Sequence, residues 1–223
     1  MSRNMQKIIS AAKELFFPKK CLFCAAYGDF LCGDCQSLLD ISPTHRPDKT
    51  KKYLSDIYSP CPYENKRVKK IIHNCKYEPF SRELARPMAE IIAGHFSLCG
   101  KNTAGFILVP VPLAPKRLRQ RGFNQALILA QELARIWKIP LAADCLIKIR
   151  ETKRQAELSQ EERLENLREA FLAADKEIFK NKRVLLLDDV ATTGATMEEC
   201  AKTLRRANAI EVVGVCFART EGE

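Results

Sequence analysis

The spacing of hydrophobic residues changes character near Tyr53. From there onward, short continuous apolar runs alternate with segments in which apolar residues recur every three or four positions. The runs at 106–112, 183–189 and 211–218 have the length and composition of buried strands. Strands that alternate with helices predict an α/β fold with a parallel sheet flanked by helices.

The segments with helical spacing lie between these runs. In the clearest of them Asn124 is placed to cap the helix, and in another Ser159 and Glu162 have the spacing of a capping box. The expected helices cover 63–77, 83–96, 123–138, 158–171 and 196–209. The last of these joins two strands, so it predicts a βαβ unit with parallel pairing.

The first part of the chain follows another pattern. A short amphipathic helix is expected ahead of residue 20, and a cluster of cysteines follows it. The stretch SPTHRPDKTKK, with two prolines and a charge run, predicts a loop or linker at 42–52. We therefore expect two domains: a helix with a Cys₄ module at 1–45, and the α/β domain at 53–223.

The charge balance narrows the class of partner. The net charge of +10 at pH 7 favours nucleic acid, polyphosphates or anionic lipid, with a merely solubilising basic surface as the alternative. The apolar stretch NTAGFILVPVPLAP is too short to span a membrane. Lys13 and Glu14 fall where a signal peptide needs its apolar centre. A cytoplasmic location is therefore expected, with peripheral attachment at the inner face of the membrane left open.

Four of the ten cysteines form a doubled Cys-x-x-Cys pattern within CLFCAAYGDFLCGDC. Cys21 pairs with Cys24, and Cys32 pairs with Cys35. Without a secretory signal, this pattern favours a tetrahedral Zn²⁺ site over disulfides. Because four protein ligands leave no open position, the expected role is structural. Free or redox-active thiols and an iron–sulfur cluster are the alternatives.

The remaining cysteines are scattered along the chain. Cys145, Cys200 and Cys216 lie in apolar segments, where burial is expected. Whether Cys61 and Cys75 bind a second metal ion is left open.

The stretch VLLLDDVATTGAT, residues 184–196, raises the question of a ligand site. A buried strand ends on two adjacent acids, and small residues then lead into a helix. Ligands of parallel sheets bind beyond the carboxyl ends of the strands, and a helix start offers unpaired N–H groups and a positive dipole end to a phosphate. The expected 5-phosphate site consists of Ala191, Thr192, Thr193, Gly194, Ala195 and Thr196.

The two acids, Asp188 and Asp189, need a separate role because they would repel a phosphate. Their carboxylates are suited to accept hydrogen bonds from two vicinal sugar hydroxyls, or to hold Mg²⁺ directly or through water. Together with the Thr/Gly loop they predict a ribose 5-phosphate site. Neither a P-loop nor a dinucleotide-binding glycine motif is present in the sequence.

Two basic segments could supply the charge that a diphosphate requires, since arginine forks hold phosphate oxygens in bidentate fashion. One, APKRLRQRG, follows the strand at 106–112, and the other, RETKRQAELS, is expected on a loop that closes over the ligand. The residues concerned are Lys116, Arg117, Arg119, Arg121, Arg150, Lys153 and Arg154. Both segments could equally contact the phosphates of a DNA backbone, and the sequence does not distinguish diphosphate binding from DNA binding.

These motifs resemble those of a known family. VLLLDDVATTGAT is similar to the phosphoribosyl-diphosphate-binding motif of type I phosphoribosyltransferases. The stretches 109–130 and 150–171, with the Cys₄ module ahead of them, resemble the ComF family of competence proteins. The similarity covers nearly the whole chain. It implies a type I phosphoribosyltransferase fold behind a small zinc-ribbon-like module, with Asp188 and Asp189 on the ribose and residues 191–196 on the 5-phosphate.

The resemblance also implies a function. A ComF-type protein is expected to bind phosphoribosyl diphosphate with Mg²⁺ and to act in DNA uptake during natural transformation, beside membrane import machinery and a helicase-like ATPase. As an enzyme it would be a phosphoribosyltransferase, but the sequence indicates neither an acceptor nor a general base. The alternative is a single-stranded-DNA-binding or adaptor protein that keeps the sugar-phosphate site without catalysis.

Overall fold

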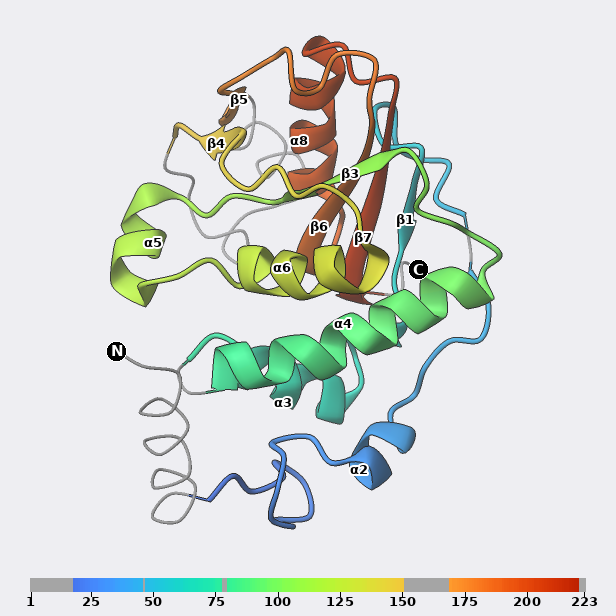
Figure 1. Cartoon of the computed structure of the whole chain (residues 1–223), viewed down its shortest axis with the longest axis vertical. Coiled ribbons are helices and arrows are strands. Elements are labelled where there is room, and N and C mark those ends of the chain that lie inside the picture. Colours follow the sequence, from blue (N-terminus) through green and yellow to red (C-terminus); the bar gives the residue numbers. More distant parts are fainter. Residues whose placement is uncertain (1–17, 46, 78–79, 151–168, 221–223) are drawn as a thin grey trace. The chain divides into compact units, whose positions relative to one another are not determined.

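The computed structural model describes residues 18–45, 47–77, 80–150 and 169–220 (Figure 1). The chain divides into two compact units, Met1–Leu39 and Asp40–Glu223. The helix expected ahead of residue 20 and most of the one expected at 158–171 lie outside the described residues. Phe171, at the end of that second segment, lies in a strand instead of a helix.

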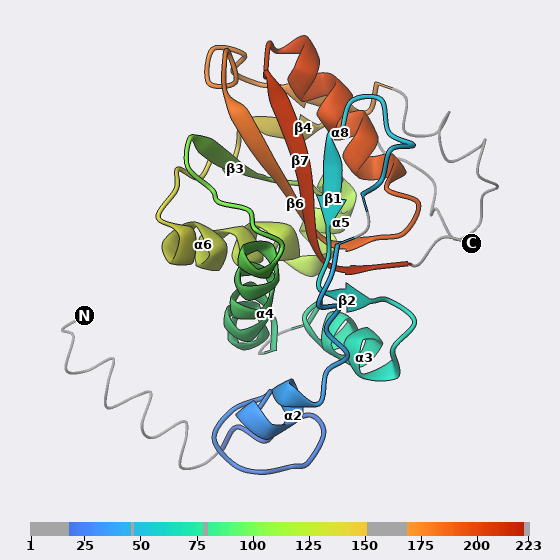
Figure 2. The same ribbon diagram turned by 90° about the vertical axis from the view of Figure 1, so that its right-hand side faces the viewer.

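The larger unit is built on a parallel sheet whose strands come from distant parts of the chain (Figure 2). The three apolar runs form β3 (Phe106–Pro110), β6 (Arg183–Ala191) and β7 (Glu211–Arg219), as their composition predicted. With β1 (Asp56–Tyr58), the order is β1-β7-β6-β3, and β2 (Cys61–Pro62) also pairs with β7. Every pairing in this sheet is parallel, as the βαβ pattern predicted.

Four described helices of the larger unit follow the predicted spacing closely: α3 (Lys66–Asn74), α4 (Phe80–Leu98), α6 (Gln125–Trp137) and α8 (Ala195–Arg206). Another described helix is α5 (Pro115–Arg121). Asn124 caps α6 as predicted, because its side chain accepts a hydrogen bond from the N–H of Ala126. The short helix α5 was not expected. None of the described helices is both long enough and apolar enough to cross a bilayer.

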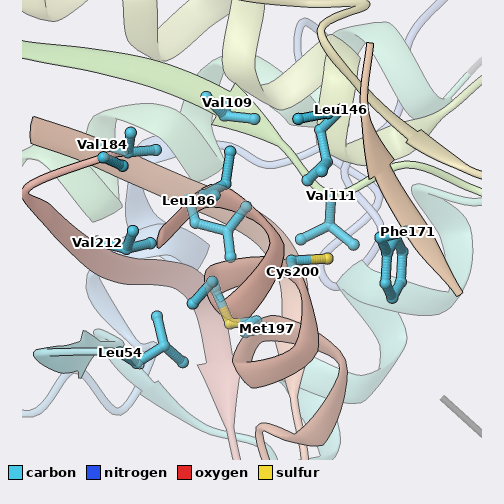
Figure 3. Packing of buried hydrophobic residues seen from close by; sticks show 14 of the residues in the cluster. Leu54, Val109, Val111, Leu146, Phe171, Val184, Leu186, Met197, Cys200 and Val212 are labelled. Carbon is cyan, nitrogen blue, oxygen red and sulfur yellow. The ribbon is translucent and has the colours of Figure 1, made fainter. Parts of the chain in front are cut away.

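Hydrophobic side chains fill both faces of the sheet. On β6, Val184 and Leu186 lie in one cluster with Met197 and Cys200 of α8 (Figure 3). The residues that alternate with them, such as Leu185, are also fully buried and point to the opposite face. Helices α4 and α6 pack there. This arrangement fixes the start of α8 at the carboxyl edge of the sheet, one short loop after β6.

A second, two-stranded sheet lies beside α8. It consists of β4 (Leu146–Lys148) and β5 (Phe171–Ala173), which pair in antiparallel fashion with Ile147 opposite Leu172. Its two strands flank the segment 149–170, so the second basic stretch begins at the end of β4.

Candidate functional site

The strands that precede two of the three predicted motifs, β3 and β6, are neighbours in the sheet. In the parallel pairing of β3 with β6, Pro110 lies opposite Leu187. The N–H of Val111 then donates to the carbonyl of Leu187 at 2.8 Å. β3 therefore ends opposite Leu187, while β6 continues to Ala191. The chain just after β3 thus lies beside the end of the buried part of β6, although more than 70 residues of sequence separate the two strands.

Helix α5 presents the first basic segment. It begins at Pro115, which suits the first turn because proline lacks the N–H that would remain unpaired there. It ends at Gly122, whose φ of 80° is the left-handed conformation common after a helix. No residue of α5 is buried. Its basic side chains comprise three exposed ones, Lys116, Arg117 and Arg119, and the half-buried Arg121.

The two acids end the buried part of β6 and are themselves half-buried. Burial and the negative charge of Asp189 together raise the pKa of Asp188 well above its ordinary value. Two contacts oppose that rise: the N–H of Asp189 donates to Asp188 Oδ1 at 2.9 Å, and the positive charge of Lys76 lies near. Ionised carboxylates held this closely need hydroxyl donors or a cation, and both sugar diols and Mg²⁺ meet that need.

The Thr/Gly loop joins β6 to α8. Gly194 is the residue before the first turn of α8, and its φ of 71° lies in the left-handed region. A Cβ at this position would also lie 3.0 Å from Ile57 Cδ1 and 3.1 Å from Lys51 Cε. The left-handed backbone therefore favours glycine here, and the ends of both side chains would have to shift to admit any other residue. The N–H of Ala195 reaches Thr193 Oγ1 at 3.4 Å, a long hydrogen bond.

Residues 51–54 contact this loop and the first turn of α8, which no sequence pattern predicted. Lys51 donates from Nζ to the carbonyl oxygen of Thr193 at 2.8 Å. The carboxylate of Glu198, in the first turn of α8, accepts from the N–H groups of Lys52, Tyr53 and Leu54 at 2.8 to 3.1 Å. No local sequence signal marks these contacts, since their partners lie more than 140 residues apart.

A cavity of about 360 Å³ lies next to the loop, on the β1 side of the sheet. Thr220 lines it and donates its N–H to the carbonyl of Ala191 at 3.1 Å, which ties the cavity wall to the end of β6. Asp48 and Arg219 form an ion pair in the same wall. The remaining lining residues are Ser42, Thr44, His45, Pro47, Lys49, Thr50, Ile57, Ser59, Cys61 and Pro62. This wall consists mainly of polar side chains from the segment expected as a linker.

The second basic segment is described only at its start. Arg150 is exposed just beyond β4. Lys153 and Arg154 lie outside the described residues. Their expected place over the diphosphate therefore stays a prediction.

The smaller unit brings the four predicted cysteines together. The N–H of Cys21 donates to the carbonyl of Ala26 at 2.8 Å, which closes the first turn, and Cys32 precedes the short helix α2 (Gly33–Ser37) that carries Cys35. The four sulfur atoms lie within 4.8 Å of one another. Zn–S bonds of about 2.3 Å at tetrahedral angles put sulfur atoms roughly 3.8 Å apart, so the spacing suits Zn²⁺.

The ionisation of these thiols is unequal. Burial and hydrogen bonds from the neighbouring thiols raise the pKa of Cys35 to about 12. For Cys21, backbone hydrogen bonds outweigh the effect of burial and lower the pKa to about 6. Four thiolates this close repel one another unless a cation balances them, which is the chemistry of a structural zinc site.

The other cysteines form no comparable group. Within the described part of the chain, Cys21, Cys24, Cys32 and Cys35 are the one cluster that could hold a metal ion. Cys61 and Cys75 are each buried but belong to no such cluster, so the structure offers no support for a second metal site. Cys200 and Cys216 are buried as expected, whereas Cys145 is only half-buried.

Comparison with known proteins places these features in a family. Residues 121–222 match the phosphoribosyl transferase domain family. The chain is 42% identical over 106 residues to Competence protein F of Haemophilus influenzae, covering 47% of this chain and 46% of that protein. It is 32% identical over 154 residues to DNA utilization protein YhgH of Escherichia coli K12, covering 67% and 66%. It is 37% identical over 99 residues to Competence protein ComFC of Bacillus subtilis, covering 44% and 38%.

The chain thus spans between two fifths and two thirds of the length of these relatives. Among solved structures it is similar to glutamine phosphoribosylpyrophosphate amidotransferase from B. subtilis, with 21% identity, a TM-score of 0.42, and coverage of 66% of this chain and 30% of that one. A likeness of that size carries no argument about ligands. The sequence relatives are named as competence and DNA-utilization proteins, and residues 121–222 of this chain match the transferase domain. The chain therefore belongs to the ComF family of competence proteins and carries a phosphoribosyltransferase-like domain behind a Cys₄ cluster.

Proposed function

We propose that the larger unit binds phosphoribosyl diphosphate together with Mg²⁺ at the carboxyl edge of its sheet. Asp188 and Asp189 accept hydrogen bonds from the ribose hydroxyls, and residues 191–196 hold the 5-phosphate. The basic side chains of α5, with Arg150, Lys153 and Arg154, contact the diphosphate. Mg²⁺ supplies positive charge that balances the diphosphate and the two carboxylates.

One observation carries this proposal. The acid pair at 188–189 lies near the end of β6, and the left-handed Gly194 precedes the first turn of α8 one short loop further on. Paired carboxylates and a helix start thus lie at one edge of one sheet. The basic segment follows β3, the strand that pairs with β6, and we expect it to supply the positive charge at this edge. A sugar that carries phosphate at both ends needs this combination, because its hydroxyls and its two phosphate groups require opposite electrostatic environments.

The site also fits a transfer reaction at the sugar. Displacement of diphosphate from the anomeric carbon passes through a transition state with positive charge on the ribose and growing negative charge on the leaving group. The half-buried carboxylates at 188–189 stabilise the positive charge on the ribose, and the arginines of α5 stabilise the negative charge on the leaving diphosphate. We name no acceptor, and the catalytic step is no part of the proposal.

We further propose a role in DNA uptake during natural transformation, since the relatives are named for competence and DNA utilization. The expected partners are the membrane DNA-import machinery and a helicase-like ATPase. The expected location is the cytoplasm, with attachment at the inner face of the membrane. The four cysteines hold a structural zinc ion.

Thermal unfolding with and without ligand tests the sugar-phosphate site. Phosphoribosyl diphosphate with Mg²⁺, at about a hundredfold excess over its Kd, stabilises the folded protein by about 2.7 kcal/mol, or roughly 5–10 °C for a chain of this size. The double variant Asp188→Asn, Asp189→Asn should lose this shift. The pair Asp144→Asn, Asp175→Asn removes two exposed carboxylates elsewhere and should keep it. An equal shift in the first double variant would falsify the ribose assignment.

A second candidate function is the binding of single-stranded DNA. It is favoured by α5, which exposes three basic side chains and buries none of its residues. Such a surface suits a phosphate backbone as well as a diphosphate. Competition separates the two: if DNA occupies the same arginines, phosphoribosyl diphosphate displaces it, and if DNA binds elsewhere, both bind together.

A further inference from the structure

One buried contact ties the Thr/Gly loop to a distant part of the larger unit. Lys51 is half-buried, and its ammonium group donates to the carbonyl oxygen of Thr193 at 2.8 Å. A lysine that loses water to reach a backbone carbonyl forms a charge-assisted hydrogen bond, which is stronger than one between neutral groups. The contact therefore constrains the peptide between Thr193 and Gly194.

The geometry of a trans peptide decides what this constraint does. The C=O and the N–H of one peptide unit point in opposite directions. With the Thr193 carbonyl turned to Lys51, the N–H of Gly194 is turned away from Lys51. Gly194 is left-handed and is followed by the first turn of α8. Successive N–H groups around such a residue form a concavity that binds anions.

The position of Lys51 is itself enforced. The carboxylate of Glu198 accepts hydrogen bonds from the three N–H groups that follow Lys51 in the chain, those of Lys52, Tyr53 and Leu54. Glu198 lies in the first turn of α8, where its charge would otherwise oppose an anion at the helix start. These three donors offset that charge and anchor the segment to α8.

The stem of Lys51 also packs against the loop. Its Cε lies 3.1 Å from the place where a Cβ of residue 194 would stand, and Ile57 Cδ1 lies 3.0 Å from the same place. Lys51 and Ile57 thus form a wall directly behind Gly194. A side chain at position 194 would meet both of them.

We propose that Lys51 is a positioning residue for the 5-phosphate site: it holds the Thr193–Gly194 peptide in the orientation that presents the Gly194 N–H to the phosphate. The inference deepens the proposed function and rests on it for the identity of the ligand. Lys51 acts from behind the loop, through the peptide.

Three variants of the full chain test the inference. Lys51→Met keeps an unbranched stem against Gly194 but removes the donor and the charge. Lys51→Arg restores both. Lys49→Met removes the same charge from an exposed side chain two residues away. Should Lys51→Met fail to fold, Lys51→Gln replaces it, because its amide donates without a charge.

Two probes are used with each variant: phosphoribosyl diphosphate with Mg²⁺, by calorimetry, and inorganic phosphate, by the amide NMR signals of Gly194 and Ala195. Loss of a charge-assisted hydrogen bond should raise both Kd values about 10- to 100-fold in Lys51→Met. Lys51→Arg should stay within about threefold of the wild type, and Lys49→Met within about twofold. The Gly194 signal of ligand-free Lys51→Met should already differ from that of the wild type.

The outcomes separate this inference from the proposed function. If Lys51→Met binds both probes as the wild type does, the inference is overturned while the proposed function stands. If the wild type binds phosphate in a Lys51-dependent way but not phosphoribosyl diphosphate, the proposed function fails and the positioning role stands. If the wild type binds neither probe, both are overturned. Equal weakening by Lys49→Met would show that only net charge matters, which also overturns the inference.

Discussion

The Cys₄ cluster and the carboxyl edge of the sheet around the Thr/Gly loop reach their geometry by different routes. The four thiols come from one stretch, residues 21–35, and local turns bring their sulfur atoms within 4.8 Å. The carboxyl edge joins residues 51–54 to Thr193 and Glu198, and Val111 to Leu187, contacts that depend on the pairing of the strands in one sheet. The cysteine cluster therefore depends on local spacing, and the carboxyl edge depends on the packing of a whole domain.

This difference predicts which changes each region tolerates. Removing a thiol should unfold the smaller unit and leave the larger one intact. Changes at the carboxyl edge should leave the metal content untouched and alter ligand binding or the stability of the larger unit.

The largest effect on stability is expected from changes at the cysteines of the smaller unit. The double variant Cys21→Ser, Cys24→Ser should lose about one zinc ion per chain. The smaller unit would then lose the apparent zinc-binding free energy, about 10–16 kcal/mol, which is what folds small zinc modules. Elemental analysis measures the metal, and amide NMR spectra show whether residues 18–39 stay folded. Cys145→Ser, outside the cluster, should keep both the metal and the fold. A metal-free wild type with a folded module would rule out the zinc site.

The second-largest effect on stability is expected from a change at Gly194. Gly194→Ala places a Cβ in a left-handed conformation against Ile57 and Lys51, and should destabilise the larger unit by about 1–3 kcal/mol. Binding of phosphoribosyl diphosphate should be lost with it. Gly94→Ala is the matched control, because Gly94 is exposed on α4 with open space around it. This variant should raise the free energy of unfolding by about 0.5–1 kcal/mol. Chemical denaturation measures both. Equal effects at the two glycines would contradict the tight wall behind the loop.

A smaller effect is expected at Asp188, and its sign follows from the pKa. Burial and the charge of Asp189 raise the pKa of Asp188 in the folded protein, so the folded state holds this proton more tightly than the unfolded chain does. The resulting stability is complete below the ordinary pKa of 3.8 and is lost as the pH rises through the raised value.

At neutral pH, Asp188→Asn should therefore stabilise the ligand-free protein by roughly 1 kcal/mol, or about 2–4 °C, while it weakens ligand binding. Melting temperatures of the wild type and the variant, measured from about pH 4 to pH 8, check this. The two curves should diverge as the pH rises. Parallel curves would show that the pKa of Asp188 is not raised in the folded protein.

The smallest effect on stability is expected at α5. Neutralising Arg117, Arg119 and Arg121 to Gln should change the free energy of unfolding by less than about 0.5 kcal/mol, since the helix buries none of its residues. If these side chains contact single-stranded DNA, the slope of log affinity against log salt should fall by about 2. The control neutralises Lys176, Lys180 and Lys182, which are exposed at the amino end of β6. The same salt slope in both triple variants would exclude α5 from the DNA contact.

Much of the fold could be predicted because it depends on local patterns. The apolar runs that became β3, β6 and β7 and the periodic segments that became α4 and α6 are continuous in sequence, and Asn124 capped α6 as its side chain predicts. Helix α5 was missed because it has no apolar face to reveal a period. The strand at Phe171 was missed because the helical pattern before it continues through that residue.

The sequence by itself determined the parts of this protein whose chemistry lies within a few neighbouring residues. The cysteine spacing, the acid pair after a buried strand and the glycine before α8 all belong to this class, because turns and strand ends bring such neighbours together wherever they occur. Only the tertiary structure decided that Lys51 supports Thr193, that Glu198 anchors residues 52–54, and that Val111, just after β3, contacts Leu187 on β6. These contacts follow from strand order and register, which are set by the burial of the whole sheet between its helices.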